Sequence, residues 1–346
     1  MSDKKNIITA TLIFVLFFLL FPLKLVPNLN YNSADSMKLS LVQTPLSGEK
    51  IPYIYKNHAG YFTKDLEESW GVKIKDGITL LDSSFINSSR DKKIIQIRNF
   101  DGDIKFSIED DGYPFSISDR LYVISRDRKS LYEIEEGRVK WSRSFNYIIT
   151  SIDGNFDTTV IGFAKGFFTV LDSDGEITFD YEPGGSRVSI IYSVVISKDS
   201  KYIGIVSGLD PQRFILYERR GVEYKPYYTT TLKDEIRKSV KLFITSNNRS
   251  VFLQNSSGFF IINIEEKSDT FFESNYNLKN VEYLKELDIY LVHSGAVNYN
   301  NIKLLTPDNR VLLENNFIGE GVSVRSMNKS IYTVIDDSVI KLDIRE

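Results

Sequence analysis

Runs of alternating apolar and polar residues, each interrupted by a short polar turn, recur along most of the chain. Residues 166–181, GFFTVLDSDGEITFDY, show the form clearly, with one run on each side of the turn at Asp172–Gly175. Successive side chains of a β-strand point to opposite faces of a sheet, so such a run predicts a half-buried strand. Two runs around an Asp-Gly turn therefore predict a β-hairpin.

The same hairpin recurs with a spacing of about 41 residues, within the range of propeller repeats. Its further copies are residues 94–108, 131–145, 214–228, 259–274 and 302–317, and the turn glycines are Gly102, Gly137, Gly175 and Gly221. The stretches between these hairpins supply two more apolar runs each. A repeat of this length with four short strands is typical of the blade of a β-propeller.

Two stretches resemble blades of known propeller families. Residues 193–218, SVVISKDSKYIGIVSGLDPQRFILYE, resemble a WD40-type blade, and residues 168–181 resemble the last two strands of a quinoprotein-like blade. The resemblance implies a propeller over roughly residues 50–346. The Trp-Asp and Gly-His signatures of WD40 repeats are absent.

The repeat length predicts a seven-bladed ring over residues 51–346, with eight blades as the alternative because 61–74 can itself form a hairpin. Residues 321–346 supply only three strands for the last blade. A ring needs that edge covered, so we expect a strand from 59–74, such as Trp70–Ile74, to complete it. Residues 230–240 carry a capping-box spacing and predict one or two helical turns.

The N-terminal residues predict a membrane anchor. From Ile7 to Val26 the single charge is Lys24, and this length of helix crosses a bilayer core of about 30 Å. We expect an uncleaved signal-anchor transmembrane helix within residues 1–26, with a cleaved signal peptide as the alternative. A tether then covers residues 27–50 and the propeller residues 51–346. The positive-inside rule then predicts a single-pass inner or plasma membrane protein with its C-terminal domain on the periplasmic or extracellular side.

Composition supports an all-β fold and excludes several chemistries. The 346 residues include 23 Phe and 20 Tyr but no Cys, which excludes disulfides, thiol nucleophiles and a lipidated cysteine. A net charge of −3 gives no general attraction to nucleic acid. The densest basic cluster, interrupted by Asp119 and Asp127, is interpreted as a solvated surface and comprises Arg120, Arg126, Arg128 and Lys129.

No pattern of residues predicts a catalytic, cofactor or metal site. The two histidines, His58 and His293, are too few for a histidine metal centre, and no nucleophile elbow, phosphate loop or zinc motif occurs. A calcium loop at 172–176 would need more ligands than Asp172, Asp174 and Glu176 provide. We therefore expect no catalytic, cofactor-binding or metal-binding residues.

The absence of a catalytic constellation favours a non-catalytic scaffold for protein–protein interaction in an envelope assembly or motor complex. In plan the chain is similar to the propeller component of the outer-membrane barrel assembly machinery, which is anchored through a Cys that this chain lacks. The expected partners are other envelope proteins and the membrane, not nucleic acid. The alternative is an anchored carbohydrate-active hydrolase or carbohydrate-binding propeller, which would gather acids and a base at one mouth of the channel.

Overall fold

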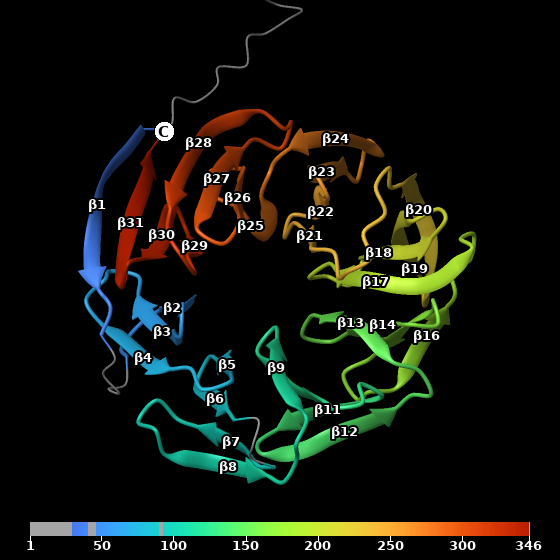
Figure 1. Ribbon diagram of the computed structural model, residues 1–346, viewed down its shortest axis with the longest axis horizontal. Coiled ribbons are helices and arrows are strands. Elements are labelled where there is room, and N and C mark those ends of the chain that lie inside the picture. Colours follow the sequence, from blue (N-terminus) through green and yellow to red (C-terminus); the bar gives the residue numbers. More distant parts are fainter. Residues whose placement is uncertain (1–29, 41–45, 90–92, 346) are drawn as a thin grey trace, which may run out of the picture.

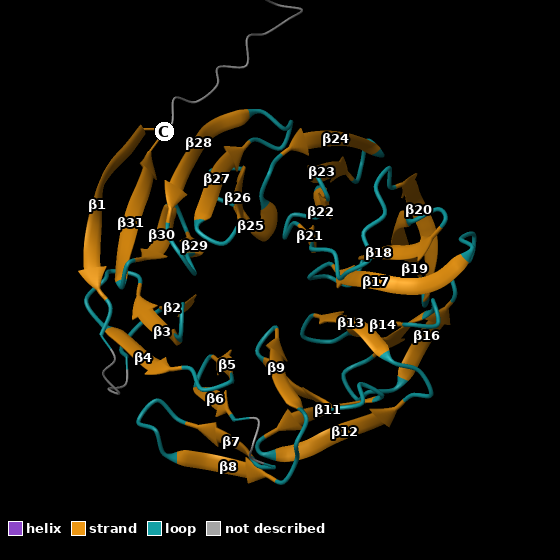
Figure 2. Cartoon of the chain, viewed as in Figure 1, coloured by secondary structure: helices purple, strands orange, loops and turns teal. Residues whose placement is uncertain are grey.

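The fold is an eight-bladed β-propeller. The computed structural model describes residues 30–40, 46–89 and 93–345, and within these ranges every regular element is a β-strand. The strands form eight antiparallel sheets set around a common axis (Figure 1), joined by loops and turns (Figure 2). The prediction of a β-propeller is confirmed. The expectation of seven blades is wrong, and the eight-bladed alternative is the one observed.

Blade 1 has three strands and blades 2 to 4 have four each. Blade 1 holds β2 (Lys50–Tyr55), β3 (His58–Thr63) and β4 (Ser69–Lys73). Blade 2 holds β5 (Gly77–Leu81), β6 (Ser84–Ser88), β7 (Ile95–Arg98) and β8 (Ile104–Ile108). Blade 3 holds β9 (Tyr113–Ile117), β10 (Arg120–Ile124), β11 (Ser130–Glu135) and β12 (Arg138–Ser144). Blade 4 holds β13 (Ile149–Gly154), β14 (Thr159–Phe163), β15 (Phe168–Leu171) and β16 (Ile177–Tyr181).

The remaining blades follow in chain order, except that the last one takes a strand from the start of the chain. Blade 5 holds β17 (Val188–Ile196), β18 (Tyr202–Leu209), β19 (Arg213–Arg220) and β20 (Glu223–Thr231). Blade 6 holds β21 (Leu242–Ile244), β22 (Ser250–Asn255), β23 (Gly258–Asn263) and β24 (Ser268–Glu273). Blade 7 holds β25 (Asn277–Leu284), β26 (Ile289–Gly295), β27 (Tyr299–Leu305) and β28 (Val311–Ile318). Blade 8 holds β29 (Ser323–Met327), β30 (Ser330–Ile335), β31 (Ser338–Arg345) and β1 (Asn30–Lys38).

Burial follows the position of a strand in its blade. All residues of β14 and β15, the middle strands of blade 4, are buried, because neighbouring blades cover both faces of the sheet. The outermost strand of blade 2, β8, has four of its five residues exposed. The core is therefore a ring of apolar layers between successive blades, and the outermost strands form the rim.

Strand β1 closes the ring. It pairs antiparallel with β31, with Lys38 opposite Ser338. Met37 of this strand and Leu39 just after it pack against a core cluster that includes Tyr53 and Val339. A terminal strand thus completes the last blade, but it comes from the segment expected to be a tether and not from 59–74.

The segment proposed for closure belongs to blade 1 itself. Strand β4 pairs with β3, with Trp70 opposite Tyr61, and β3 pairs with β2. Blade 1 contains three strands, and the fourth strand of blade 8 is β1, which precedes residue 51. Dividing the length of residues 51–346 by the length of a four-stranded repeat therefore gives one blade too few.

The insertion before blade 6 forms an extended loop, so the prediction of helical turns over 230–240 is wrong. Its apolar side chains Leu232, Ile236 and Val240 are buried in the core cluster between blades 5 and 6. The Gln212 side chain exchanges two hydrogen bonds with the backbone of Ile236, at 3.0 and 2.8 Å. Tertiary burial and this amide bridge determine the conformation, in place of the local capping signal.

The expected transmembrane helix over residues 1–26 lies outside the described residues. Within the part of the chain that the structure describes, no helix is long and apolar enough to span a bilayer. The described residues therefore do not support the expected localisation as a single-pass membrane protein.

Candidate functional site

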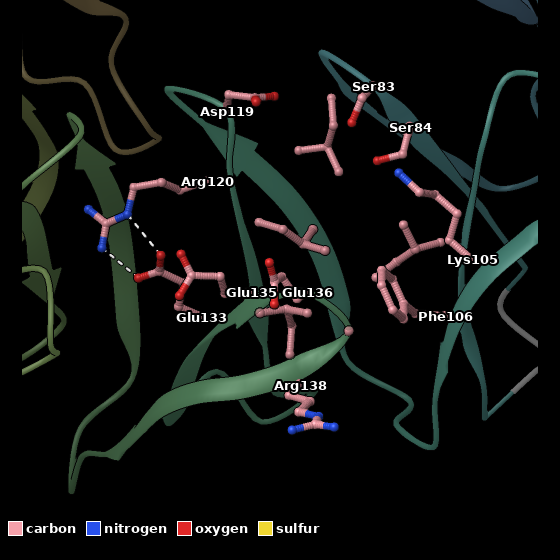
Figure 3. Close-up of a pocket in the computed structure, with 15 residues that line it drawn as sticks. Ser83, Ser84, Lys105, Phe106, Asp119, Arg120, Glu133, Glu135, Glu136 and Arg138 are labelled. Atoms are coloured by element: carbon pink, nitrogen blue, oxygen red, sulfur yellow. Dashed lines mark hydrogen bonds and ion pairs between the residues drawn. The ribbon is translucent and has the colours of Figure 1, made fainter.

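A cleft of about 790 Å³ opens between blades 2 and 3 (Figure 3). The turns after β5 and β9 form one side, and strand β8 and the β11–β12 hairpin form the other. Charged residues of both signs line it, namely Lys105, Asp119, Arg120, Glu133, Glu135, Glu136 and Arg138. Its volume exceeds those of four other pockets among the described residues, which measure about 300 to 480 Å³.

The innermost charges of the cleft form a buried ion pair. The side chains of Arg120 and Glu133 are 10% and 4% exposed, and two hydrogen bonds of 2.5 and 3.1 Å join the guanidinium to the carboxylate. Trp141 Nε1 donates to the same carboxylate at 2.7 Å, and Arg120 also donates to the Asn155 carbonyl in blade 4 at 3.0 Å. Because its oxygens are engaged in this way, Glu133 is a structural carboxylate that holds Arg120, and Arg120 in turn ties blade 3 to blade 4.

The outer wall of the cleft depends on a glycine. Gly137, in the β11–β12 turn, has φ of +76°, and a Cβ at this position would lie 2.3 Å from the Phe106 ring of β8. The absent side chain therefore allows the turn of blade 3 to lie directly against the outermost strand of blade 2. Gly175 repeats the arrangement one blade further on, against Trp141 of β12.

These contacts join the outermost strands of blades 2 to 4 into one surface with exposed apolar side chains. We define the rim surface as Ile104, Phe106, Val139 and Ile177, whose exposed fractions are 48, 38, 52 and 53%. Ile104 and Phe106 lie on β8, Val139 follows the Gly137 turn, and Ile177 follows the Gly175 turn. Adjacent exposed apolar groups on neighbouring edge strands are typical of a binding surface.

The pocket near the axis is smaller and less charged than the cleft. A pocket of about 350 Å³ there is lined mainly by apolar and small polar residues of β2, β5 and β9, with Arg325 as its one charged residue. The nearby carboxylate of Glu282 accepts hydrogen bonds from the Ser326 backbone and hydroxyl at 2.6 and 2.5 Å. Asp153 accepts one from Ile196 N at 2.8 Å, and burial raises its pKa to about 6. These carboxylates join neighbouring innermost strands to one another.

Histidine does not supply a metal site in the described structure. His293 is buried on β26 and contacts Asn300 Oδ1 through Nε2 at 3.1 Å, while His58 begins β3 in another blade. Burial lowers the pKa of His293 to about 4. Among the described residues, no group of three or more His, Asp or Glu side chains is placed to hold an ion.

The hairpin at 166–181 forms the two outer strands of blade 4, β15 and β16. Asp172 Oδ1 accepts hydrogen bonds from the backbone nitrogens of Asp174 and Glu176 at 3.0 and 2.9 Å, so this carboxylate closes the turn between β15 and β16. Gly175 has φ of +76°, as its place in a tight turn requires.

The basic cluster of the sequence divides between two sides of the ring. Strand β10 places Arg120 at one end, in the cleft, and Arg126, Arg128 and Lys129 beyond the other end, in the β10–β11 loop. Arg126 pairs with Asp111 at 3.3 Å. Sequence reasoning identified these residues but not the aromatic side chains beside them, Tyr147 and Phe167, which come from two other loops.

Sequence similarity places the chain in a β-propeller family. Residues 3–346 match the profile of a family described as beta-propeller protein, so the chain belongs to that family. A protein of Treponema pallidum (strain Nichols), named only as uncharacterized, is 22% identical over 215 residues, which cover 62% of this chain and 57% of that protein.

Solved structures share the architecture at low sequence identity. BamB from Moraxella catarrhalis superposes with a TM-score of 0.62 at 14% identity, covering 91% of this chain and all of that chain. The Dos1 propeller gives 0.58 at 12% identity, covering 84 and 81% of the two chains. The computationally designed Ika8 protein gives 0.63 at 11% identity, covering 89 and 99%. At these identities the likeness shows the fold alone.

Proposed function

We propose that this chain is a non-catalytic propeller that binds other proteins, with the rim surface as its principal contact area. The observation that carries the proposal is strand β8, an outermost strand whose exposed residues include Ile104 and Phe106. Envelope proteins are the candidate partners, following the likeness in plan to the propeller of the barrel assembly machinery.

The chemistry of an edge strand supports this role. The outermost strand of a blade has backbone N–H and C=O groups on its outer side without a neighbouring strand, and an extended segment of a partner can pair with them. Exposed apolar side chains on the same strand add burial of about 25 cal/mol per Å². In the cleft beside β8, the side chains of Lys105 and Arg138 provide charged groups that can orient a partner.

The carbohydrate-active alternative is favoured less by the geometry. It requires acids and a base at one mouth of the channel, whereas the axial pocket between β2, β5 and β9 is lined without carboxylate or histidine. The buried carboxylate in the cleft, Glu133, is already engaged by Arg120 and Trp141.

Site-specific photocrosslinking tests the proposal. A photoreactive phenylalanine analogue at Phe106 should give a discrete adduct with one protein in cells of the source organism. The matched control is Phe271 on β24, another outermost strand, where the ring is similarly exposed. Equal adducts at both positions, or none at Phe106, would contradict a partner bound at the rim surface.

A further inference from the structure

Three loops from blades 3 and 4 are joined at one end of the ring. Phe145 N donates to the Lys129 carbonyl at 2.7 Å, which links the β12–β13 loop to the β10–β11 loop. Ala164 N donates to the Ile148 carbonyl at 2.9 Å, which adds the β14–β15 loop. Backbone bonds between loops fix their relative positions, so the side chains they carry form one surface.

The centre of this surface is apolar and supported from below. The Tyr147 ring packs edge-on against the Phe167 ring with centroids 5.5 Å apart, and Phe167 stacks at 4.4 Å on the fully buried Phe163. Tyr147 and its neighbour Ile148 remain 43 and 47% exposed. A ring held by a stacked pair has little rotamer entropy left to lose when a ligand covers it.

Cations surround the apolar centre. Lys129 accepts one of the backbone bonds that join the loops, Lys165 follows Ala164 of the other, and both lysines are exposed. Arg128 is also exposed, with one long contact of 3.5 Å from its guanidinium to the Thr150 carbonyl. The carboxylate among them, Asp127, accepts hydrogen bonds from the Ser125 hydroxyl and Lys129 N within its own loop. The surface therefore has an excess of positive charge.

We propose that this surface, the loop platform, binds an acidic protein segment that carries an aromatic or large aliphatic side chain. The platform comprises Arg128, Lys129, Tyr147, Ile148, Lys165 and Phe167. The apolar side chain of the partner covers Tyr147 and Ile148, and its carboxylates lie against the surrounding cations. The loop platform lies apart from the rim surface, so this proposal does not depend on the function proposed above.

Charge complementarity favours an acidic protein segment over nucleic acid. Proteins that bind nucleic acid by its backbone commonly neutralise about 6–10 phosphates, and the loop platform offers three cations around an apolar centre. The whole chain carries a formal charge of −3, so it has no long-range field that would attract a polyanion.

Fluorescence anisotropy with the full chain tests the proposal. The probes are a labelled peptide of alternating Glu and Phe, the same peptide with Ser for Phe, and single-stranded oligouridine. The Glu-Phe peptide should bind most tightly, and the double variant Lys129→Glu, Lys165→Glu should weaken it by about tenfold or more.

Two controls separate this outcome from others. Lys198→Glu with Lys285→Glu reverses the same charge at exposed turns on the opposite end of the ring and should change affinity by less than about twofold. Tyr147→Ser should weaken the Glu-Phe peptide toward the affinity of the Ser peptide, while melting of the protein stays unchanged. Equal binding of both peptides, equal loss in the control charge reversal, or tighter binding of oligouridine would overturn the proposal.

Discussion

Adding one methyl group at Gly175 should destabilise the ring more than the same change at Gly221. Both glycines occupy the turn before the outermost strand of a blade, with φ of +76° and +68°. A Cβ at Gly175 would lie 2.5 Å from Trp141 Cδ2, whereas a Cβ at Gly221 meets no atom within 4 Å. The pair therefore separates backbone strain from steric overlap.

The magnitudes follow from these two terms. Placing alanine at positive φ costs about 1–2 kcal/mol at either position. At Gly175 the buried indole must also move, and overpacking of this kind costs about 1–3 kcal/mol. Moving Trp141 lengthens its 2.7 Å hydrogen bond to Glu133, which accepts from Arg120 as well. We expect a total of about 2–5 kcal/mol for Gly175→Ala and about 1–2 kcal/mol for Gly221→Ala.

Urea unfolding followed by tryptophan fluorescence measures the difference. The chain has two tryptophans, Trp70 and Trp141, so a change in the native emission of Gly175→Ala reports directly on the displaced indole. Equal shifts of the unfolding midpoint in the two variants would refute the reasoning. If the native emission of Gly175→Ala were unchanged, the Trp141 ring would not be what restricts the side chain at this turn.

Three further predictions address closure, the hairpin turn and protonation. Deleting Asn30–Lys38 exposes the edge of β31 and should lower the melting temperature and promote aggregation, measured by light scattering; an unchanged melt would show that β1 is dispensable. Asp174→Asn should leave melting unchanged with or without calcium, because the turn is closed by Asp172. Burial holds the pKa of His293 near 4, below its unfolded value of 6.5, so the unfolded state binds more protons and stability falls as pH drops through this window. His293→Gln should remove about 3 kcal/mol of this pH dependence of the free energy of unfolding, measured as urea midpoints. Asp153→Asn should make the fall in stability on acidification steeper, because the pKa of Asp153 is raised to about 6 and its protonation favours the folded state.

The hairpins could be predicted from sequence because their determinants are local. Gly102, Gly137, Gly175 and Gly221 all have positive φ in the structure, in the turns where the Asp-Gly and related pairs placed them. The alternation of apolar and polar residues then indicated which side chains of each strand face the neighbouring blade. The number of blades depends on a contact between residues distant in the sequence, since β1 completes blade 8 from the other end of the chain.

The surfaces of the ring were harder to predict than its strands. Arg120 and Arg126 are six residues apart in the sequence, yet Arg120 begins β10 and Arg126 follows its end, so they lie at opposite ends of blade 3. Conversely, Lys129 and Lys165 are distant in sequence and become part of one surface through backbone bonds between loops. No periodic pattern encodes such a contact, because it depends on how adjacent blades pack.

Both proposed surfaces lie on blades 2 to 4, and the ring is closed elsewhere, within blade 8 (Figure 1). The joint is a strand pair, β1 with β31, supported by the side chains of Met37 and Leu39. Blades 3 and 4 are tied through Arg120, which donates to the Asn155 carbonyl while Glu133 holds its guanidinium. Blades 8 and 1 are tied through the Tyr332 hydroxyl, which donates to the Lys64 carbonyl at 2.8 Å. A partner at either proposed surface would therefore contact blades away from the strand pair of β1 and β31 that closes the ring.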